Sequence, residues 1–342
     1  MSSTSETGLP LSVLDLAMVA KGQTSAEALQ ATTTLAKHAE AHGYLRIWVA
    51  EHHNMETVAS TSPAVLMAHL AANTERIRIG SGGVMLPNHA PLVVAEQFAL
   101  LEAMNPGRID LGVGRAPGTD RSTALALRGT ADNRDAEDFP RHLIDVMGLL
   151  GDRRTEHGLW ESFRATPVLD SSPLVVPLGS SGFSAQLAGV LGLPFAFAHH
   201  FDMGGTLEAV AIYRDHFEPS PVLDRPYTIV TASAIAAESE ERAQWLSAPG
   251  RLRRFGMRTG RMIPLVSPEE AIAHEDYPHA LRMPSSSILG TAEQVTSGLR
   301  ELAERTEASE LMLYTAAHGL ADRLDSLTLI AEAWTTAPAP TG

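Results

Sequence analysis

The sequence predicts an α/β fold, a parallel (β/α)8 TIM barrel with insertions after strands 4 and 7. Short apolar runs bounded by Gly, Pro or Asn alternate with stretches of helical periodicity along the whole 342-residue chain, as they do in repeated βαβ units. Runs such as 174–178 and 195–198 are apolar almost throughout, which is expected when protein covers both faces of a strand. Eight such units can close into a barrel.

The predicted elements follow one another in order along the chain. The strand candidates are 11–19, 45–50, 77–86, 108–114, 174–179, 194–198, 227–234 and 310–314. The helix candidates are 25–42, 62–73, 91–104, 138–150, 183–191, 206–217, 238–247, 291–306 and 320–335. Glycine or proline stands in three of the helix-to-strand turns, where it ends the helix. An open doubly wound sheet is the competing architecture, but no G-x-G-x-x-G segment opens a helix and no linker divides the chain.

Composition limits the classes of function. With 44% hydrophobic residues, the chain can bury one large core, and we expect a single barrel domain over 11–336. A disordered tail over 1–10 and a C-terminal tail over 337–342 would flank it. The absence of cysteine excludes disulfides and cysteine nucleophiles and, with no signal peptide at the N-terminus, favours the cytoplasm. A net charge of −14 argues against a nucleic-acid partner, and no apolar run predicts a membrane span.

Three stretches are longer than the other connections: 115–137, 151–173 and 248–289. The first and the last follow strands, so we expect them on the active face of the barrel. The stretch 248–289 contains Pro249-Gly250 and is a candidate for a mobile lid. It also carries a basic run between Arg251 and Arg261, which is either a solvated segment or a cover for an anionic ligand.

Polar residues after strands four and five predict a phosphate site. The segment 179–184 (GSSGFS) opens a helix with glycines and small hydroxyl residues, so its free N–H groups and the helix dipole would suit a phosphate. Arg115 ends the adjacent strand, where its guanidinium could bind the same phosphate. Two alternatives stay open, because the serines could simply cap the helix and Arg115 could pair with Asp120.

Histidine doublets end two strands. Strand two ends in Glu51-His52-His53, and strand six ends in His199-His200. Imidazoles and carboxylates can bind a metal, but neighbouring residues of a strand point to opposite faces, so each doublet offers one ring to the barrel mouth. We therefore favour a histidine that accepts a proton or donates a hydrogen bond near pH 7, while packing stays open for either member of each doublet.

Glycines interrupt the third strand at Gly80-Ser81-Gly82-Gly83. Glycine weakens a strand unless the backbone must bend or approach a ligand closely, and a flat aromatic ring could lie against this segment. A flat surface, a phosphate anchor and a histidine together describe a site for a planar, phosphate-bearing cofactor across the barrel mouth. Reduced flavin fits this description.

Three segments resemble the bacterial-luciferase-like flavin monooxygenases: 50–54 (AEHHN), 79–91 (IGSGGVMLPNHAP) and 107–115 (GRIDLGVGR). The resemblance extends over about residues 11–335. It implies a (β/α)8 barrel in which reduced flavin mononucleotide (FMN) and O2 form a flavin hydroperoxide, which transfers one oxygen atom to a small organic substrate. It also implies that a separate NAD(P)H-dependent reductase supplies the flavin, and a homodimer is the simplest expected assembly.

The resemblance also implies roles for single residues. His52 matches the catalytic histidine of the family, and Glu51 and His53 are its neighbours. Gly82 and Gly83 match a pair that a cis peptide joins beneath the isoalloxazine ring. The predicted cofactor-binding residues are Ser81, Gly82, Gly83, Arg115, Ser180, Ser181, Gly182 and Ser184.

Two departures from the family pattern indicate a relative of the luciferases, not a light-emitting enzyme. The luciferases carry a negatively charged residue where Ser180 stands and alanines where the glycine pair stands. Three other functions stay open at this point. They are a hydride-transfer oxidoreductase that uses the deazaflavin F420, a non-catalytic flavin-binding protein and a metal-dependent hydrolase.

Overall fold

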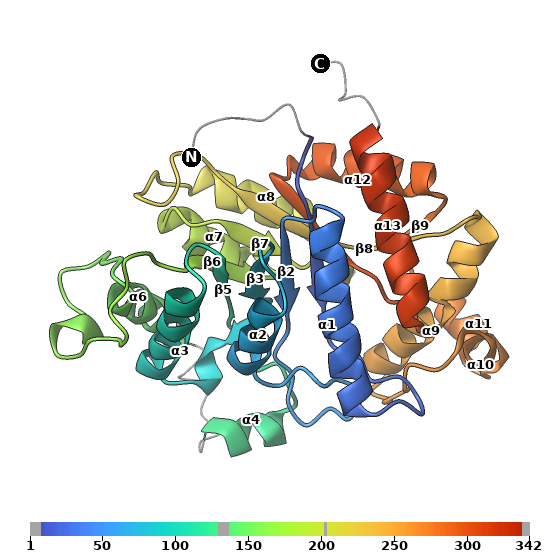
Figure 1. Cartoon of the computed structure of the whole chain (residues 1–342), viewed down its shortest axis with the longest axis horizontal. Coiled ribbons are helices and arrows are strands. Elements are labelled where there is room, and N and C mark those ends of the chain that lie inside the picture. Colours follow the sequence, from blue (N-terminus) through green and yellow to red (C-terminus); the bar gives the residue numbers. More distant parts are fainter. Residues whose placement is uncertain (1–7, 129–136, 202–203, 337–342) are drawn as a thin grey trace.

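Eight parallel strands close into a barrel in the computed structural model, which describes residues 8–128, 137–201 and 204–336 (Figure 1). In barrel order the strands are β1 (Leu11–Asp15), β2 (Arg46–Val49), β3 (Arg78–Ser81), β5 (Ile109–Gly114), β6 (Leu174–Gly179), β7 (Phe195–Phe197), β8 (Thr228–Ala236) and β10 (Glu310–Tyr314). The barrel closes because β10 pairs with both β1 and β8. The predicted TIM barrel is therefore confirmed, and each predicted strand overlaps one barrel strand.

Helices cover the outside of the barrel. They are α1 (Ser25–Ala41), α2 (Pro63–Ala72), α3 (Pro91–Met104), α6 (Phe139–Leu149), α7 (Gly182–Val190), α8 (Thr206–Asp215), α9 (Glu240–Arg258), α12 (Ala292–Thr306) and α13 (Leu320–Thr336). Capping boxes begin two of them, with Thr24 and Glu27 at α1 and Thr291 and Gln294 at α12. Figure 1 shows α1, α2, α3 and α13 across the near side of the strands.

Two short strands lie outside this order. β4 (Val84–Met85) follows the Gly82–Gly83 peptide and extends the pairing with β5 toward the carboxyl end. β9 (Ile288–Gly290) adds to β8 from the second insertion. Single turns of 3-10 helix occur at η1 (Leu86–Asn88), η2 (Leu159–Glu161) and η3 (His199–Phe201).

A buried ion network fills one end of the barrel interior. Arg46 binds Asp110 at 2.7 Å and Glu310 at 2.9 Å, and Arg78 binds the other oxygen of Asp110 at 2.5 Å. The Tyr227 hydroxyl donates to the other oxygen of Glu310 at 2.8 Å. Two guanidinium groups therefore balance two carboxylates, which is what burial of charge requires.

An apolar layer separates this network from the barrel mouth. Side chains two positions further along the strands form it, as strand alternation demands. Its buried members are Leu14, Trp48, Val176, Ala196, Ile229 and Met312. The chemistry is thereby confined to the carboxyl ends of the strands.

The second insertion differs from its prediction. The helix expected to end at 247 runs through Pro249 to Arg258, so the expected boundary is wrong. Proline removes one helical hydrogen bond. Tertiary packing fixes this segment nevertheless, since a Cβ on Gly250 would lie 3.0 Å from the Cβ of Ala316. The rest of 248–289 forms α10 (Pro268–Ala273), α11 (Tyr277–Arg282) and β9, so it is a helical insertion in place of a long loop.

The other predicted segments are described in part. The stretch 115–137 contains α4 (Arg121–Arg128), and its residues 129–136 lie outside the described part of the chain. Apart from residues 8–10, the predicted tails 1–10 and 337–342 also lie outside it. No helix among the described residues combines the length and the apolar character needed to cross a bilayer.

Candidate active site

Two cavities open at the carboxyl ends of the strands. The inner cavity, of about 260 Å3, is lined by Trp48, Gly82 and Arg115 together with the segment 178–181 and Ser184. The outer cavity, of about 400 Å3, lies between the barrel and α9. Both are lined by Leu16, His52, His200 and Phe201. The two spaces therefore meet at two histidines.

His52 is half-buried at this junction. Its Nδ1 lies 3.0 Å from the Gly118 carbonyl oxygen, and since a carbonyl can only accept, Nδ1 carries the hydrogen. The neutral ring then keeps Nε2 as a proton acceptor. Burial lowers the pKa of His52 below its ordinary value, with a smaller contribution from Arg253 in the same direction. His52 is therefore a neutral base near pH 7.

Glu51 and His53 lie behind this ring and line neither cavity. The fully buried Glu51 carboxylate accepts from His53 Nε2 and His89 Nε2, both at 2.9 Å, and from the Met85 amide at 3.0 Å. Burial opposes ionisation of Glu51, but these hydrogen bonds outweigh it and hold its pKa below the ordinary value. The carboxylate thus ties the end of β2 to β4 and η1.

The loop after β5 is fastened to the same segment. Thr119 Oγ1 donates to the His53 carbonyl at 2.9 Å, and Asn88 Nδ2 donates to the Pro117 carbonyl at 2.9 Å. With the His52–Gly118 contact, these bonds fix the backbone beside the inner cavity.

Arg115 and the start of α7 meet in the inner cavity, as the sequence predicted. The Arg115 guanidinium carbon lies 4.1 Å from the centre of the Phe183 ring. Ser180, Ser181 and Ser184 line the cavity beside it. Ser181 is the N-cap residue of α7, yet no side chain caps the helix. Asp120 instead accepts from Ser122 and Thr123, so the alternative Arg115–Asp120 pair does not form.

The glycines of β3 are explained in part by the protein's own packing. A Cβ on Gly82 would lie 2.9 Å from Leu14 Cδ1, and one on Gly83 would lie 2.8 Å from the Gly112 carbonyl oxygen. The peptide between Gly82 and Gly83 is cis, as the resemblance implied. Gly82 lines the inner cavity, whereas Gly83 does not.

Ser81 and Gly182 differ from the other predicted cofactor-binding residues in their surroundings. Ser81 is fully buried, and its hydroxyl donates to the Gly112 carbonyl at 2.8 Å. Gly182 faces α8, where a Cβ would lie 2.7 Å from Ile212 Cδ1. Neither residue lines a cavity.

His200 is a site residue that the sequence analysis considered only as a member of its doublet and did not include among the predicted catalytic or cofactor-binding residues. Its ring packs on Phe201 and Tyr314, with centroids 4.3 and 5.6 Å away, and burial lowers its pKa to about 4. Its Nδ1 is buried without a hydrogen-bond partner among the described residues. His199 turns away and contacts Thr206 Oγ1 at 2.8 Å. Each doublet thus offers one ring to the cavities, which confirms that part of the prediction.

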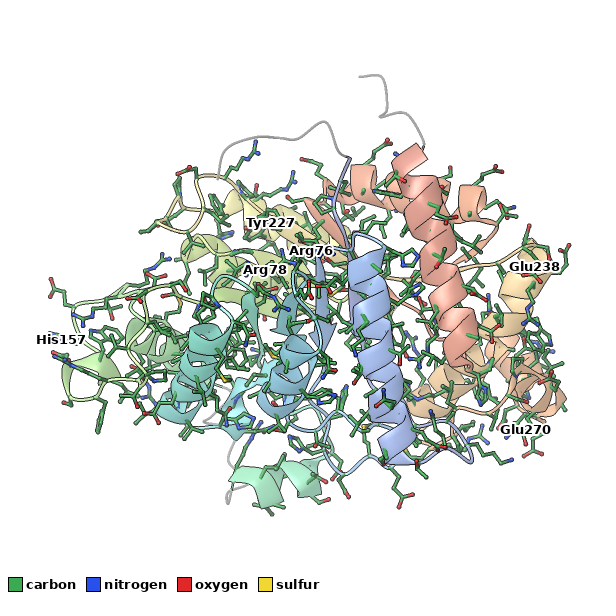
Figure 2. All side chains as sticks on the ribbon, viewed as in Figure 1. Arg76, Arg78, His157, Tyr227, Glu238 and Glu270 are labelled. Carbon is green, nitrogen blue, oxygen red and sulfur yellow. The ribbon has the colours of Figure 1, made fainter. Side chains whose placement is uncertain are left out.

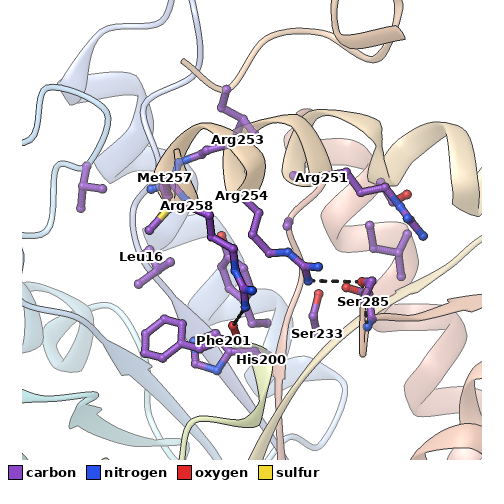
Figure 3. A pocket seen from close by; sticks show the side chains of 18 of the residues that line it. Leu16, His200, Phe201, Ser233, Arg251, Arg253, Arg254, Met257, Arg258 and Ser285 are labelled. Carbon is purple, nitrogen blue, oxygen red and sulfur yellow. Dashed lines mark hydrogen bonds between the residues drawn. The ribbon is translucent and has the colours of Figure 1, made fainter. Parts of the chain in front are cut away.

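The face of α9 that covers the outer cavity is basic. Figure 3 shows the helix across this space, with Arg254 directed to Ser285 and Arg258 to the Phe201 carbonyl. Arg251 and Arg253 also line the cavity. The basic run after Pro249 was visible in the sequence. Because the predicted helix ended at 247, the helical spacing of these arginines was missed.

Metal ligands do not gather in the described part of the chain. No group of three or more His, Asp or Glu side chains there has an arrangement that could hold a metal ion. Glu51 instead accepts a hydrogen bond from each of His53 and His89.

Comparison with known sequences decides the family. Residues 9–309 match the model described as luciferase-like monooxygenase. The chain belongs to this family. As a luciferase-like monooxygenase family member, it is a flavin-dependent oxidoreductase.

Several relatives of this luciferase-like protein match along almost their whole length. YvbT of Bacillus subtilis, which has no described function, is 44% identical over 98% of this chain and 99% of its own. A luciferase-like monooxygenase of Escherichia coli K12 is 40% identical over 89% and 91%. The N-acetyl-S-alkylcysteine monooxygenase of B. subtilis is 33% identical over 94% and 97%.

Solved structures agree with this membership. The apo form of MsnO8 superposes with a TM-score of 0.88 at 36% identity, over 98% of this chain and 100% of its own. The oxygenating component of the Pseudomonas putida 3,6-diketocamphane monooxygenase, in complex with FMN, has a TM-score of 0.69 over 96% and 98%. An F420-dependent secondary alcohol dehydrogenase has a TM-score of 0.67 over 96% and 99%. The last two are 16% identical and share the fold alone.

Proposed function

We propose that this protein is a monooxygenase that uses reduced FMN and O2 to oxygenate a small organic substrate, with the flavin supplied by a separate NAD(P)H-dependent reductase. One observation carries the proposal. Arg115 and the uncapped start of α7 line the same inner cavity as Gly82 and His52, and that cavity meets a larger one at His52. A phosphate could bind at Arg115 and α7, a planar ring could lie beside Gly82 and His52, and a substrate could occupy the larger cavity.

The residues present fit a flavin phosphate. Among the described residues, Arg115 forms no ion pair, and its guanidinium is held over Phe183 beside free N–H groups of α7. Ser180, Ser181 and Ser184 would add hydroxyl donors. Serine at position 180 avoids the repulsion that a carboxylate there would exert on a phosphate.

The middle of the inner cavity fits a flat ring. Trp48, Leu14 and Leu178 give it apolar walls, and Gly82 presents backbone without a side chain. Ser81 and Gly83 would act indirectly, since they hold β3 against β5. When bound, reduced flavin would supply the two electrons that activate O2.

His52 is the catalytic residue that we propose. Its neutral Nε2 can accept a proton beside the ring, and its Nδ1 bond to Gly118 holds the tautomer. Glu51 and His53 are positioning residues in this proposal, because they fix the segment that carries His52 without lining a cavity. Leu16, Met55 and Val58 form an apolar wall of the outer cavity, which His52 also lines.

The choice of FMN over F420 rests on the sequence relatives. Proteins named monooxygenases are 40% and 33% identical to this chain, whereas the F420-dependent dehydrogenase is 16% identical. F420-dependent hydride transfer is therefore the second candidate. We also propose a homodimer in the cytoplasm as the working form.

The deciding experiment compares the two cofactors directly. Purified protein is mixed with reduced FMN and O2, and in a parallel anaerobic assay with reduced F420 and a ketone acceptor. We expect substrate-dependent O2 uptake that exceeds the spontaneous oxidation of reduced FMN, and no oxidation of F420. Turnover of F420 without any effect on FMN would replace the proposal by the second candidate.

A further inference from the structure

The outer cavity contrasts in charge with the rest of the molecule. Four arginines of α9 line it, namely Arg251, Arg253, Arg254 and Arg258, and no Asp or Glu belongs to its described lining. The chain as a whole carries a net charge of −14. Guanidinium groups held close together repel one another, and an anion bound between them would offset this repulsion and the cost of their partial burial.

Helical spacing brings these arginines to one face. Positions 247, 250, 251, 254 and 258 follow the i, i+3, i+4, i+7, i+11 pattern, positions 253 and 257 lie beside them, and all seven line the cavity. Leu252 and Gly256 on the opposite face are buried against the insertion, so α9 cannot rotate to expose its basic side to solvent. The fold therefore holds the basic face over the cavity.

Two of the arginines have no counter-charge in the described part of the chain. Neither Arg251 nor Arg253 forms an ion pair or a hydrogen bond with a described residue, although both are half-buried. Arg253 lines the outer cavity together with His52 and Tyr314, and His52 also lines the inner cavity. Burial and the Arg258 guanidinium lower the pKa of Arg254, a further sign of crowded positive charge.

The remaining lining has a different character. Leu16, Met55, Val58, Leu265 and Leu289 form an apolar wall, and Ser233 and Ser287 add hydroxyl groups near the arginines. A cavity of about 400 Å3 has the size of a small-molecule site. One part of the space thus suits a hydrocarbon group and the other an anion.

From this arrangement we propose that the substrate is an organic anion, a carboxylate or a sulfonate with an apolar chain, whose charge is bound by Arg253 and Arg251. Arginine suits such groups because its planar fork can donate two hydrogen bonds to two oxygens of one anion. The apolar chain lies against Leu16 and its neighbours, next to His52. The inference rests on the proposed function, because the anion is a substrate only if the protein is an oxygenase. The binding of the anion can be tested without catalysis.

The test uses calorimetric titration of the whole protein with hexanoate, hexane-1-sulfonate and the neutral hexanamide. We expect both anions to bind the wild type at least about tenfold more tightly than the amide, since hydrogen bonds to charged groups are the stronger ones. Arg253→Met should remove this preference, and Arg253→Lys should restore part of it. Arg164→Met, which removes an exposed arginine outside both cavities, should leave the preference unchanged.

A second titration separates this inference from the proposed function. Reduced FMN is titrated anaerobically into the same variants, and Arg253→Met should change its affinity less than about twofold. Equal binding of hexanoate and hexanamide to the wild type would overturn the inference, and so would a large loss of FMN affinity in Arg253→Met, because Arg253 would then hold the cofactor. If hexanoate keeps its preference while FMN fails to bind the wild type, the anion site stands and the proposed function fails.

Discussion

The Nδ1 atom of His52 lies 3.0 Å from the carbonyl oxygen of Gly118, a residue in the loop that follows β5. Gly118 has a φ of +66°, and a Cβ there would lie 2.7 Å from the Glu51 carbonyl oxygen. Glycine is therefore needed for the backbone to reach the imidazole. The contact sets the tautomer that leaves Nε2 free to accept a proton.

His52→Asn tests this arrangement. We expect the rate of substrate oxygenation to fall roughly 10²–10⁴-fold, the usual contribution of a positioned proton acceptor. FMN affinity should change little, because the proposed phosphate contacts come from Arg115 and the start of α7 and not from His52. Measurement of O2 uptake at saturating reduced FMN separates the two effects. The control is His157→Asn, an exposed histidine at the edge of the molecule (Figure 2) that lines neither cavity and should behave as the wild type.

The pH dependence of the same reaction provides a separate test. Since burial lowers the pKa of His52, the ring stays neutral as the pH falls below the ordinary histidine range. The rate should therefore be constant from neutral pH down past 6.5 and decrease only at lower pH. A rate that halves near pH 7 would contradict the assigned environment of His52.

Arg115→Met should weaken FMN binding about tenfold to a hundredfold, because charge-assisted hydrogen bonds to a phosphate are lost. Riboflavin lacks the phosphate, so its affinity should change less than about twofold. Fluorescence titration of both flavins gives the comparison, with Arg164→Met as the charge-matched control. An equal loss for both flavins would assign Arg115 to packing around Phe183 instead of phosphate binding.

Much of this arrangement could be predicted from local sequence. The eight strands are apolar runs of ordinary length, and parallel strands bring their carboxyl ends together, so Arg115, His52 and Ser181 could be assigned to one end of the barrel. One ring of each histidine doublet reaches the cavities as expected, but not through strand alternation, because His52-His53 follow the end of β2 and His199-His200 lie in η3. These features depend on a few neighbouring residues.

Other features depend on residues distant in sequence and could not be predicted. Proline at 249 indicates a helix end, but the contact of Gly250 with Ala316 continues α9 across it. Glu51 looks catalytic in its sequence context, whereas its partners Met85 and His89 lie more than 30 residues away. Only the tertiary structure shows that this carboxylate is already hydrogen-bonded.

Gly112→Ala should destabilise the protein strongly. A Cβ on Gly112 would lie 2.0 Å from the Ser81 carbonyl oxygen, and a backbone atom in a closed barrel cannot move away easily. Overpacking of a core by one methyl group costs about 1–3 kcal/mol, and a backbone clash belongs at or above the upper end. Gly114→Ala is the matched control on β5, because its Cβ would meet the flexible Met85 Sδ at 3.1 Å. Urea unfolding should show a clearly larger loss for Gly112→Ala, and similar losses would contradict the packing argument.

Glu51→Gln should lower the free energy of unfolding at pH 7 by roughly 2–4 kcal/mol, since the amide cannot replace a carboxylate that accepts from His53, His89, Asn88 and the Met85 amide. The loss should depend on pH. The folded-state pKa of Glu51 lies below its ordinary value, so the carboxylate contributes stability above the unfolded pKa of about 4.3, and this is lost as the pH falls through the folded pKa. The difference between wild type and Glu51→Gln should therefore shrink from pH 7 to pH 3.5.

Urea unfolding at several pH values measures this difference, with the exposed Glu156→Gln as control. A difference that stays constant with pH would show that Glu51 is not the ionised hydrogen-bond acceptor of His53 and His89.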